Sequence, residues 1–277
     1  MDVMIDDITF EAVELTPLIG TEVKTDAESL ANGRFAKKIR ELLEQRGVLI
    51  FRDVFLTDDQ QLAFSASLGE VVRRGEVTIQ PITLDMNVTS AAEYLKGSFF
   101  WHIDGACEGV PNLAALLGAR KPSETGGETQ FANTYAAWDE LPQSEKQSLE
   151  KLRVIHCMEA TQRMVYPQPS YAQIQQWQQF GKRSQPLVWT HRSGRKSLVL
   201  GSTASHIEGL DFEEGRTLLC KLLDWATQPR FIYQHEWRLG DLLMWDNTGT
   251  MHRVLPYAAD SGRLMHRTTL EGEEVLA

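Results

Sequence analysis

The sequence has few cysteines and no long hydrophobic run, and both absences narrow the class of protein. Its 277 residues include three cysteines, Cys107, Cys157 and Cys220, an odd number at wide spacing. This pattern fits neither a disulfide framework nor a Cys-x-x-Cys zinc or redox site, so we expect a reducing compartment. No stretch approaches the roughly 18 apolar residues of a membrane span, and residues 1–9 lack the basic and apolar regions of a signal peptide. The expected location is the cytoplasm.

Positive charge is also scarce. Lysine and arginine number 28 against 38 aspartates and glutamates, which gives a formal net charge of −10. General binding of nucleic acid or of an anionic membrane relies on a basic surface, so neither partner is expected. The balance still allows a local cationic pocket for a small anion.

The chain is expected to form one domain over residues 1–277, because it contains no internal repeat, low-complexity tract or linker. Helical spacing of apolar residues predicts helices, two of them opened by capping boxes at Thr25 and Thr57, over residues 25–43, 57–68, 133–141, 144–152 and 212–226. Short apolar or alternating runs predict strands over residues 48–51, 113–119, 187–190, 198–200, 231–237 and 242–246. The last third of the chain is therefore expected to be mostly sheet.

Two segments show no strong periodicity. Residues 77–100 contain scattered apolar positions and then a loop, and residues 159–183 are polar, rich in glutamine and interrupted by prolines. Weakly structured segments that lead into a site often cover it or form its walls. We expect both segments to act as lids.

The chemistry is expected to centre on residues 99–105, where His102 and Asp104 stand two positions apart in a strand-like, aromatic setting. Side chains at i and i+2 of a strand point to the same face, so this pair can hold one cation. One more histidine would complete the two-histidine, one-carboxylate triad of non-haem Fe(II) sites. The alternative is a chance pair, with Cys107 nearby as either a site residue or a small buried hydrophobe.

Spacing alone does not select the third ligand. Six histidines remain as candidates: His156, His191, His206, His235, His252 and His266. His252 is favoured because it follows a strand and a tight turn at residues 246–249 and precedes Arg263 and Arg267.

Arg263 and Arg267 are expected to share one face of a strand, with His266 on the other face. At 3.3 Å per residue their α-carbons lie roughly 13 Å apart, so each can serve a different anion. The alternative is an exposed basic strand edge, which discourages aggregation.

Five segments, in this order along the chain, resemble the motifs of the taurine and phenoxyacetate dioxygenase family. They are residues 101–104, 126–129, 194–198, 240–252 and 263–267. The resemblance extends from the first expected helix to Leu270. It implies a mainly β protein with peripheral helices, built on a double-stranded β-helix of jelly-roll type, that depends on Fe(II), 2-oxoglutarate and O2.

The same resemblance implies a metal triad of His102, Asp104 and His252. Three protein ligands leave three positions on an octahedral iron, enough for a chelating 2-oxo acid and one oxygen molecule. The implied reaction is hydroxylation of a substrate, with succinate and CO2 as co-products.

The resemblance also implies a co-substrate clamp and a substrate anchor. Arg263, helped by the Thr129 hydroxyl, would pair with the distal carboxylate of 2-oxoglutarate, and Trp245 would pack beside the site. Arg267 matches the position that meets the substrate's anionic group in the taurine enzyme. Glu128 departs from the aspartate of many relatives but leaves Thr129 in place.

The expected substrate is a small organic acid, a carboxylate or a sulfonate, with an apolar body that is either aliphatic or aromatic. The expected apolar walls come from the two lid segments and the residues beside them: Met86, Val88, Phe99, Phe100, Met164 and Tyr166. Arg267 would only brace the fold under the alternative hypothesis. Two other functions stay open, a non-redox metal-dependent barrel enzyme and an inactive small-molecule-binding protein; an assembly of identical chains is also left open.

Overall fold

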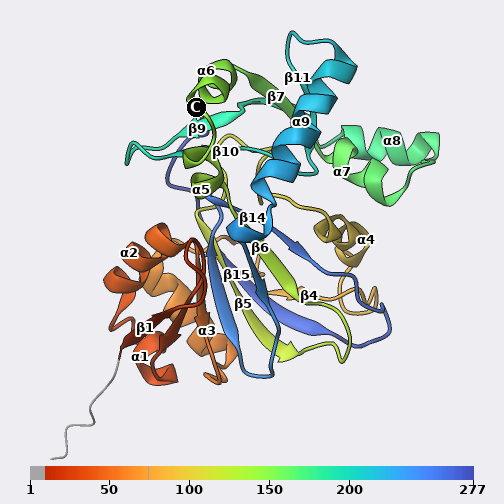
Figure 1. The fold of residues 1–277 in the computed structure, drawn as a ribbon. Helices are drawn as coiled ribbons and strands as arrows, with labels where there is room; N and C mark the ends of the chain where they lie inside the picture. Colours follow the sequence, from red (N-terminus) through yellow and green to blue (C-terminus); the bar gives the residue numbers. More distant parts are fainter. Residues whose placement is uncertain (1–9, 74) are drawn as a thin grey trace, which may run out of the picture.

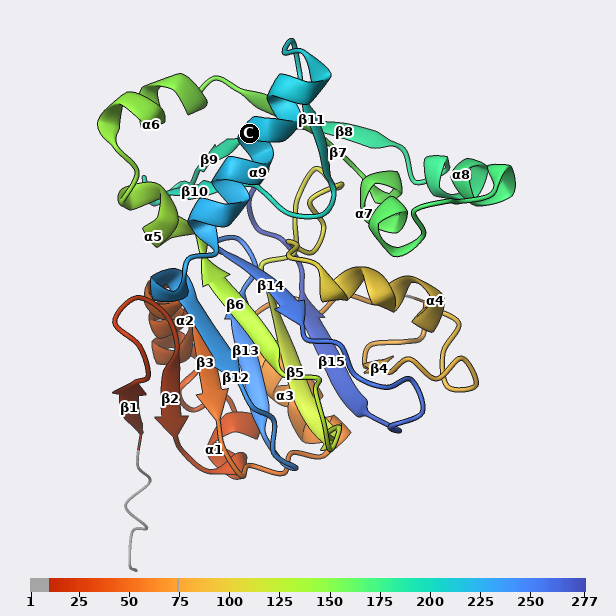
Figure 2. The same ribbon diagram turned by 45° about the vertical axis from the view of Figure 1, so that its right-hand side comes forward.

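A large mixed sheet with helices on its outer side forms the lower half of the molecule (Figures 1 and 2). The computed structural model describes residues 10–73 and 75–277, so the signal-peptide expectation, which concerns residues 1–9, lies outside the described residues. In these residues the large sheet has seven strands in the order β1-β2-β3-β13-β5-β15-β4. All neighbouring pairs are antiparallel except β2 and β3.

The strands of the large sheet are β1 Glu11–Glu14, β2 Thr21–Lys24, β3 Val48–Phe51, β4 Gln80–Ile82, β5 Ala114–Lys121, β13 Leu242–Asp246 and β15 Leu264–Leu270. Three smaller sheets use β6 Thr129–Asn133, β7 Arg153–Cys157, β8 Lys182–Pro186, β9 Val188–Thr190, β10 Lys196–Leu198, β11 Ala204–Ile207, β12 Ile232–His235 and β14 Thr250–Val254. Their orders are β12-β6-β14, β11-β7-β8 and β10-β9.

The helices are α1 Ala27–Ala31, α2 Ala36–Arg46, α3 Asp58–Leu68, α4 Ala92–Leu95, α5 Thr134–Asp139, α6 Gln143–Leu149, α7 Met158–Val165, α8 Tyr171–Gln178 and α9 Phe212–Ala226. Two short 3-10 helices, η1 Lys96–Phe99 and η2 Pro229–Phe231, connect neighbouring elements. The chain thus combines sheets and helices as expected for an α+β protein.

Strand β13 shows how one sequence run builds two different cores. Leu242 and Met244 pack with the residues under α1, α2 and α3. Leu243 and Trp245, at the alternate positions, join a second core that contains Phe131 of β6. Because side chains alternate along a strand, this run of consecutive apolar residues is buried on both faces of the large sheet. The inner face meets the small sheet that carries β6 and β14.

The first expected helix is divided. The chain forms α1 and α2 with a break at residues 32–35, where Asn32 and Gly33 form a turn. The expected capping box at Thr25 is wrong, because Asp26 is the N-cap and its carboxylate accepts from the backbone N–H of Ser29 at 2.7 Å. The box at Thr57 is confirmed.

The two expected lid segments contain more regular structure than their sequence suggested. Residues 77–100 include β4, α4 and η1, and residues 159–183 include most of α7 and all of α8. Figure 2 shows α7 and α8 on the same side of the molecule as α4. Tyr94 of α4 contacts both Gln176 and Phe180, so the two segments touch.

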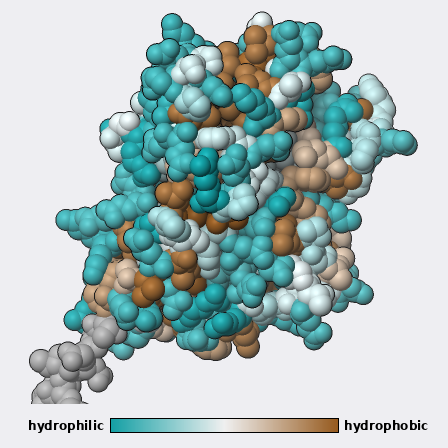
Figure 3. All heavy atoms as spheres, viewed as in Figure 1, coloured by the Kyte–Doolittle hydropathy of each residue, from teal (hydrophilic) through white to brown (hydrophobic). Residues whose placement is uncertain are grey.

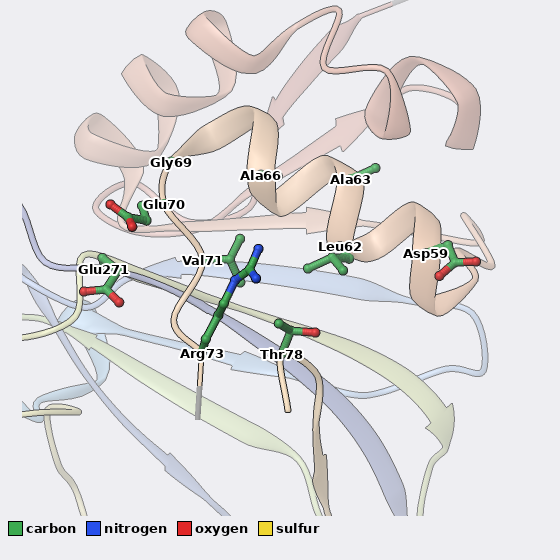
Figure 4. Close-up of a pocket in the computed structure, with 10 residues that line it drawn as sticks. All are labelled: Asp59, Leu62, Ala63, Ala66, Gly69, Glu70, Val71, Arg73, Thr78 and Glu271. Carbon is green, nitrogen blue, oxygen red and sulfur yellow. The ribbon is translucent and has the colours of Figure 1, made fainter. Parts of the chain in front are cut away.

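The surface is mostly hydrophilic, with separate hydrophobic areas (Figure 3). Among the described residues, no helix has both the length and the apolar character needed to cross a bilayer. A hollow runs beside α3, where Glu70, Arg73 and Glu271 lie on its rim (Figure 4). The described residues that line it include none of the expected site residues, so the site is sought on the inner face of the large sheet.

Candidate active site

His102 and His252 are brought together by main-chain pairing. The backbone N–H of His102 donates to the carbonyl of His252 at 3.0 Å, and the reverse bond is 2.9 Å. Residues that exchange both bonds across an antiparallel pair point their side chains to the same face. The imidazole centroids are accordingly 4.1 Å apart. The segment before Asp104 thus extends the small sheet beyond β14.

Asp104 completes a compact group with the two histidines. Its Oδ1 is 3.8 Å from Nε2 of His102, and its Oδ2 is 3.7 Å from Nε2 of His252. One ligand atom from each of the three residues lies within 4.8 Å of the others. Two imidazole nitrogens and a carboxylate at this separation match the donor set of a non-haem iron site.

The protonation states also suit a metal. Nδ1 of His102 lies 2.9 Å from the carbonyl of Phe100, which accepts its proton and leaves Nε2 with a free lone pair. Burial, and then the neighbouring His102, hold the pKa of His252 well below its usual value, so this ring is neutral. Nδ1 of His252 has no hydrogen-bond partner among the described residues.

Asn247 and Gly201 support this group from outside. The side-chain oxygen of Asn247 accepts from the backbone N–H of Asp104 at 2.9 Å, and its amide donates to the Asp104 carbonyl at 2.7 Å. At Gly201, where φ is +114°, a Cβ would come within 2.7 Å of the Trp101 carbonyl oxygen and 2.9 Å of the His102 α-carbon. Only glycine lets the chain approach the ligand strand so closely.

Arg263 precedes β15 and is only 3% exposed. Among the described residues no carboxylate pairs with it, its Nη2 donates to the carbonyl of Gly127 at 3.3 Å, and its Nε is buried without a partner. Its guanidinium lies over the ring of Tyr257, 4.8 Å from the ring centroid. Burial lowers the pKa of Arg263, and Tyr257 partly opposes this. A buried guanidinium without a carboxylate partner could bind an anion.

Thr129 begins β6 and is 4% exposed. The indole N–H of Trp237 donates to its hydroxyl oxygen at 2.9 Å. Because the oxygen is occupied as an acceptor by Trp237, the hydroxyl proton is free to be donated elsewhere. Trp245 packs beside the metal group as expected, with its ring 4.8 Å from that of His252.

Arg267 reaches the metal group itself. Its Nη1 donates to Oδ2 of Asp104 at 3.2 Å, and its Nη2 donates to the side chain of Gln80 at 3.0 Å. Strand β15, which carries Arg267, lies between β5 and β4, and Arg263 is buried. The hypothesis of an exposed basic strand edge is therefore wrong.

Several residues that the sequence offered as site candidates lie elsewhere. His156, His191, His206, His235 and His266 are outside the metal group, which contains only His102, Asp104 and His252 among the described residues. Cys107 is half-buried, and burial raises the pKa of its thiol to about 12, which disfavours the thiolate form.

Only some of the residues expected to form the apolar walls lie near the site. Phe100 and Met164 line a separate cavity of about 620 Å³ between α7 and α9. Phe99 contacts Tyr257, with ring centroids 6.0 Å apart, and so lies beside the Arg263 pocket. Met86 and Val88 are more than half exposed. Of this set, Phe99 has a direct contact that connects it to the site.

Sequence reasoning missed Asn247, Trp237, Tyr257 and Gln80. Trp237 precedes Trp245 by eight residues, and Tyr257 precedes Arg263 by six. This spacing does not indicate that Trp237 contacts Thr129 or that Tyr257 contacts Arg263. Gln80 lies in residues 77–100, where the sequence does not indicate which strand pairs with the segment, so its position beside Arg267 is not predictable.

Known proteins match this chain along most of its length. The family model described as taurine catabolism dioxygenase TauD, TfdA family matches residues 11–269. An alpha-ketoglutarate-dependent 2,4-dichlorophenoxyacetate dioxygenase from Burkholderia sp. (strain RASC) is 34% identical over 255 residues, which cover 85% of each chain. An (S)-phenoxypropionate/alpha-ketoglutarate-dioxygenase from Sphingobium herbicidovorans is 31% identical, with 82% of each chain covered. The crystal structure of AAD-2 in complex with Mn(II) and N-oxalylglycine is similar with a TM-score of 0.84 and 32% identity, covering 98% of this chain and all of that one.

Proposed function

This chain belongs to the TauD, TfdA family of dioxygenases, and from that premise we propose that it hydroxylates a small organic acid, a carboxylate or a sulfonate. It is an oxidoreductase of the 2-oxoglutarate-dependent dioxygenase class, which uses Fe(II), 2-oxoglutarate and O2. Succinate and CO2 are the co-products. The substrates named for the relatives, phenoxyacetate and phenoxypropionate derivatives, are aromatic acids and support an aromatic body for this substrate as well.

His102, Asp104 and His252 are the proposed iron ligands. The observation that carries the proposal is their geometry, with one ligand atom from each within 4.8 Å of the others and both imidazoles offering Nε2. Bound Fe(II), with 2-oxoglutarate and O2, supplies the oxidant that removes hydrogen from a substrate C–H bond. His102, Asp104 and His252 would hold the iron through three donors and would leave positions for 2-oxoglutarate and O2.

Arg263 and Thr129 are the proposed clamp for the distal carboxylate of 2-oxoglutarate. The support is the buried Arg263 guanidinium, which has no carboxylate partner among the described residues, and the Thr129 hydroxyl, whose proton Trp237 leaves free. A bidentate guanidinium and one hydroxyl satisfy a planar carboxylate well. Tyr257 would hold the guanidinium in place from the side.

Arg267 is the proposed anchor for the anionic group of the substrate. Its contacts with Asp104 and Gln80 place it next to the proposed iron site, at the base of the segment expected to act as a lid. A substrate anion bound there would hold the rest of the molecule over the open side of the metal. The proposed role of residues 77–100 and 159–183 is to exclude water from this space.

We further propose that the large sheet and the β12-β6-β14 sheet form the double-stranded β-helix of the family, within one domain over residues 1–277. The support is their shared core, in which Phe131 and Trp245 pack with ring centroids 5.6 Å apart. A cytoplasmic location remains the prediction from the sequence.

The deciding experiment is anaerobic addition of 2-oxoglutarate to the protein loaded with Fe(II). We expect a visible charge-transfer absorption, and after admission of O2 a slow formation of succinate that the right organic acid accelerates. The Asp104→Ala variant is the matched control and should show neither signal. A wild-type protein that binds 2-oxoglutarate with no absorption change and forms no succinate contradicts the proposal.

A further inference from the structure

Asp241 belongs to one of the five segments that resemble the family, residues 240–252, yet it lies outside the proposed metal group. It is 1% exposed and directly precedes β13, whereas Arg52 directly follows β3, the strand that pairs with β13. The Arg52 guanidinium donates to Oδ2 of Asp241. Burial opposes ionisation of Asp241, but His235, the N–H of Arg238 and Arg52 outweigh it and hold the pKa of the carboxyl below its ordinary value. A charged carboxylate is thus buried at the ends of two neighbouring strands.

Arg52 and Asp241 together hold the main chain on both sides of Trp237. Nη1 of Arg52 donates to the carbonyl of Glu236 at 3.0 Å, and the backbone N–H of Arg238 donates to Oδ2 of Asp241 at 2.9 Å. Trp237 lies in an irregular segment beyond the end of β12, where the pairing with β6 has stopped. Because the ladder of the sheet does not extend to Trp237, these two bonds fix the course of the chain there.

His235 connects Asp241 to the indole ring of Trp237. Nε2 of His235 lies 3.2 Å from Oδ2 of Asp241, and its Nδ1 lies 3.1 Å from the Tyr233 hydroxyl. The side chain is fully buried, and burial lowers its pKa although Asp241 opposes this, so the ring is neutral. It packs edge to face on the indole, with ring centroids 4.4 Å apart. Asp241 therefore acts on Trp237 through the main chain and through this ring.

Trp237 in turn holds the hydroxyl of Thr129. Thr129 lies opposite His235 in the pairing of β6 with β12, so the two side chains point to the same face. Two residues further along, the indole N–H of Trp237 donates to the Thr129 oxygen at 2.9 Å. The setting of this hydroxyl thus depends on a side chain in an irregular segment, and that segment depends on Asp241.

We propose that Asp241 is a positioning residue for 2-oxoglutarate, because it holds Trp237 where the indole keeps the Thr129 proton directed at the distal carboxylate. This inference rests on the proposed function, in which Thr129 and Arg263 form the clamp. Asp241 acts only through Trp237 and touches neither the co-substrate nor the iron. Its removal should therefore weaken 2-oxoglutarate binding by no more than the loss of one hydrogen bond, about threefold to tenfold.

The first measurement is anaerobic calorimetric titration of the full chain, loaded with Fe(II), with 2-oxoglutarate. Asp241→Ala should raise the dissociation constant by about threefold to tenfold. Asp241→Asn keeps an oxygen that accepts from Arg52 and from the N–H of Arg238, so its dissociation constant should stay close to that of the wild type.

Asp58→Ala is the matched control. The Asp58 carboxylate also pairs with an arginine and a histidine, Arg120 at 2.8 Å and His266 at 2.7 Å, but it lies at the start of α3. This variant loses a similar set of contacts away from the clamp, and it should bind 2-oxoglutarate as the wild type does.

A double-mutant cycle separates action through Trp237 from a general loss of stability. In Trp237→Phe the hydrogen bond to Thr129 is already absent. Adding Asp241→Ala to this variant should therefore not raise the dissociation constant further. A double variant in which the two effects multiply would overturn the inference.

The indole N–H of Trp237 gives a readout that needs neither turnover nor 2-oxoglutarate. In the full chain labelled with ¹⁵N-tryptophan and loaded with diamagnetic Zn(II), its NMR signal is the one missing from Trp237→Phe. Hydrogen exchange at this N–H should be faster in Asp241→Ala than in wild type, and close to wild type in Asp241→Asn and Asp58→Ala. Arg52→Ala, which removes the bond to the Glu236 carbonyl, should also speed the exchange and weaken 2-oxoglutarate binding.

Unchanged 2-oxoglutarate affinity in folded Asp241→Ala overturns the inference, and so does unchanged indole exchange. If Asp241→Ala does not fold, the same two results in Arg52→Ala decide the matter. Failure of the wild type to bind 2-oxoglutarate would overturn the proposed function and this inference with it, whereas normal wild-type binding with unchanged variants overturns this inference alone.

Discussion

The Asn247 side chain forms hydrogen bonds with both main-chain polar groups of Asp104: its oxygen accepts from the N–H at 2.9 Å, and its amide donates to the carbonyl at 2.7 Å. The same amide donates to the carbonyl of Asn112 at 3.0 Å. One side chain therefore fixes the backbone that carries the proposed carboxylate ligand, although it cannot itself reach a metal bound on the other side of that residue. Support of this kind often matters nearly as much as the ligands.

Asn247→Ala should weaken iron binding by about tenfold to a hundredfold without removing a ligand. The reason is that Asp104 would lose both hydrogen bonds that orient its peptide. Competition with a metal-binding dye measures the affinity directly. Asn112→Ala is the control, because only the backbone carbonyl of Asn112 takes part. Equal iron affinity in Asn247→Ala and wild type would show that the turn orients Asp104 without this side chain.

Arg263→Ala should raise the 2-oxoglutarate concentration needed for half-maximal turnover by two to three orders of magnitude. Leaving a carboxylate unpaired in a buried pocket costs about 3–5 kcal/mol, and roughly 1.4 kcal/mol corresponds to a factor of ten. Succinate formation at varied 2-oxoglutarate gives the answer. Arg216→Ala on α9 serves as the matched arginine control, and an unchanged requirement in Arg263→Ala would assign the clamp to another residue.

Trp237→Phe should raise the same 2-oxoglutarate requirement by about threefold to tenfold, the effect of one hydrogen bond. Without the indole N–H, the Thr129 hydroxyl is no longer held with its proton directed outward. The maximal rate should change little, since Trp237 does not touch the metal group. Trp225→Phe, which loses an indole bond to the Ala137 carbonyl far from the site, should behave as the wild type. A fall in maximal rate with no change in the requirement would assign Trp237 a different role.

Arg267→Ala should abolish the preference for anionic substrates. Hydrogen bonds to a charged group contribute about 1.5–3 kcal/mol, so stimulation of succinate formation by the best acid should fall by about tenfold to a hundredfold. The measurement compares carboxylates and sulfonates with their neutral amides or alcohols. Arg120→Ala, whose side chain pairs with Asp58 away from the site, is the control. Equal stimulation of the wild type by neutral analogues would remove the claim of an anionic substrate and leave the oxygenase class intact.

His156 should make the protein less stable in acid. Its side chain is fully buried, and burial lowers its pKa to about 4, below the 6.5 of an exposed histidine. Its contribution is therefore present above about pH 6.5 and is lost as the pH falls toward 4, by about 2 kcal/mol at pH 5. Denaturant unfolding at several pH values gives the free energy of unfolding as a function of pH. Between pH 7 and 4 this free energy should fall less steeply for His156→Gln than for wild type. His206→Gln, on the paired strand β11, should keep the wild-type slope; a shared slope in all three proteins would refute the assignment.

The part of the site that the sequence revealed rests on local geometry and ordered motifs. His102 and Asp104 are recognisable because strand alternation puts i and i+2 on one face, and Asp246 to Thr248 read as a turn. His252 could not be chosen by spacing among six histidines, because its place depends on the backbone bonds to His102 that form only in the fold. Family motifs supplied what spacing did not.

The differences between the expected and the observed structure have identifiable physical causes. The Asn32-Gly33 break between α1 and α2 carries a turn signal that the regular apolar spacing on either side obscured. Helix α8 was expected to be irregular because its residues are polar, yet Ser170 and Gln173 form a capping box that marks its start. The contact of Trp237 with Thr129 joins residues that are more than 100 positions apart in the sequence, so a single sequence does not reveal it.

Strand β4 is the edge of the proposed substrate site that we expect to open most easily. It has three residues, ends the order of the large sheet, and contains Pro81, which has no N–H to donate to β15. In hydrogen-exchange terms, the amides of Gln80 and Ile82 should lose protection long before those of β5 and β13. Local opening there would separate Gln80 from Arg267 while the backbone pairing of His102 with His252 stays intact, so under the proposed function a bulky acid would enter and leave without disturbing the proposed metal ligands. If the substrate binds at Arg267 as proposed, hydrogen-exchange protection of the β4 amides should rise when substrate is added.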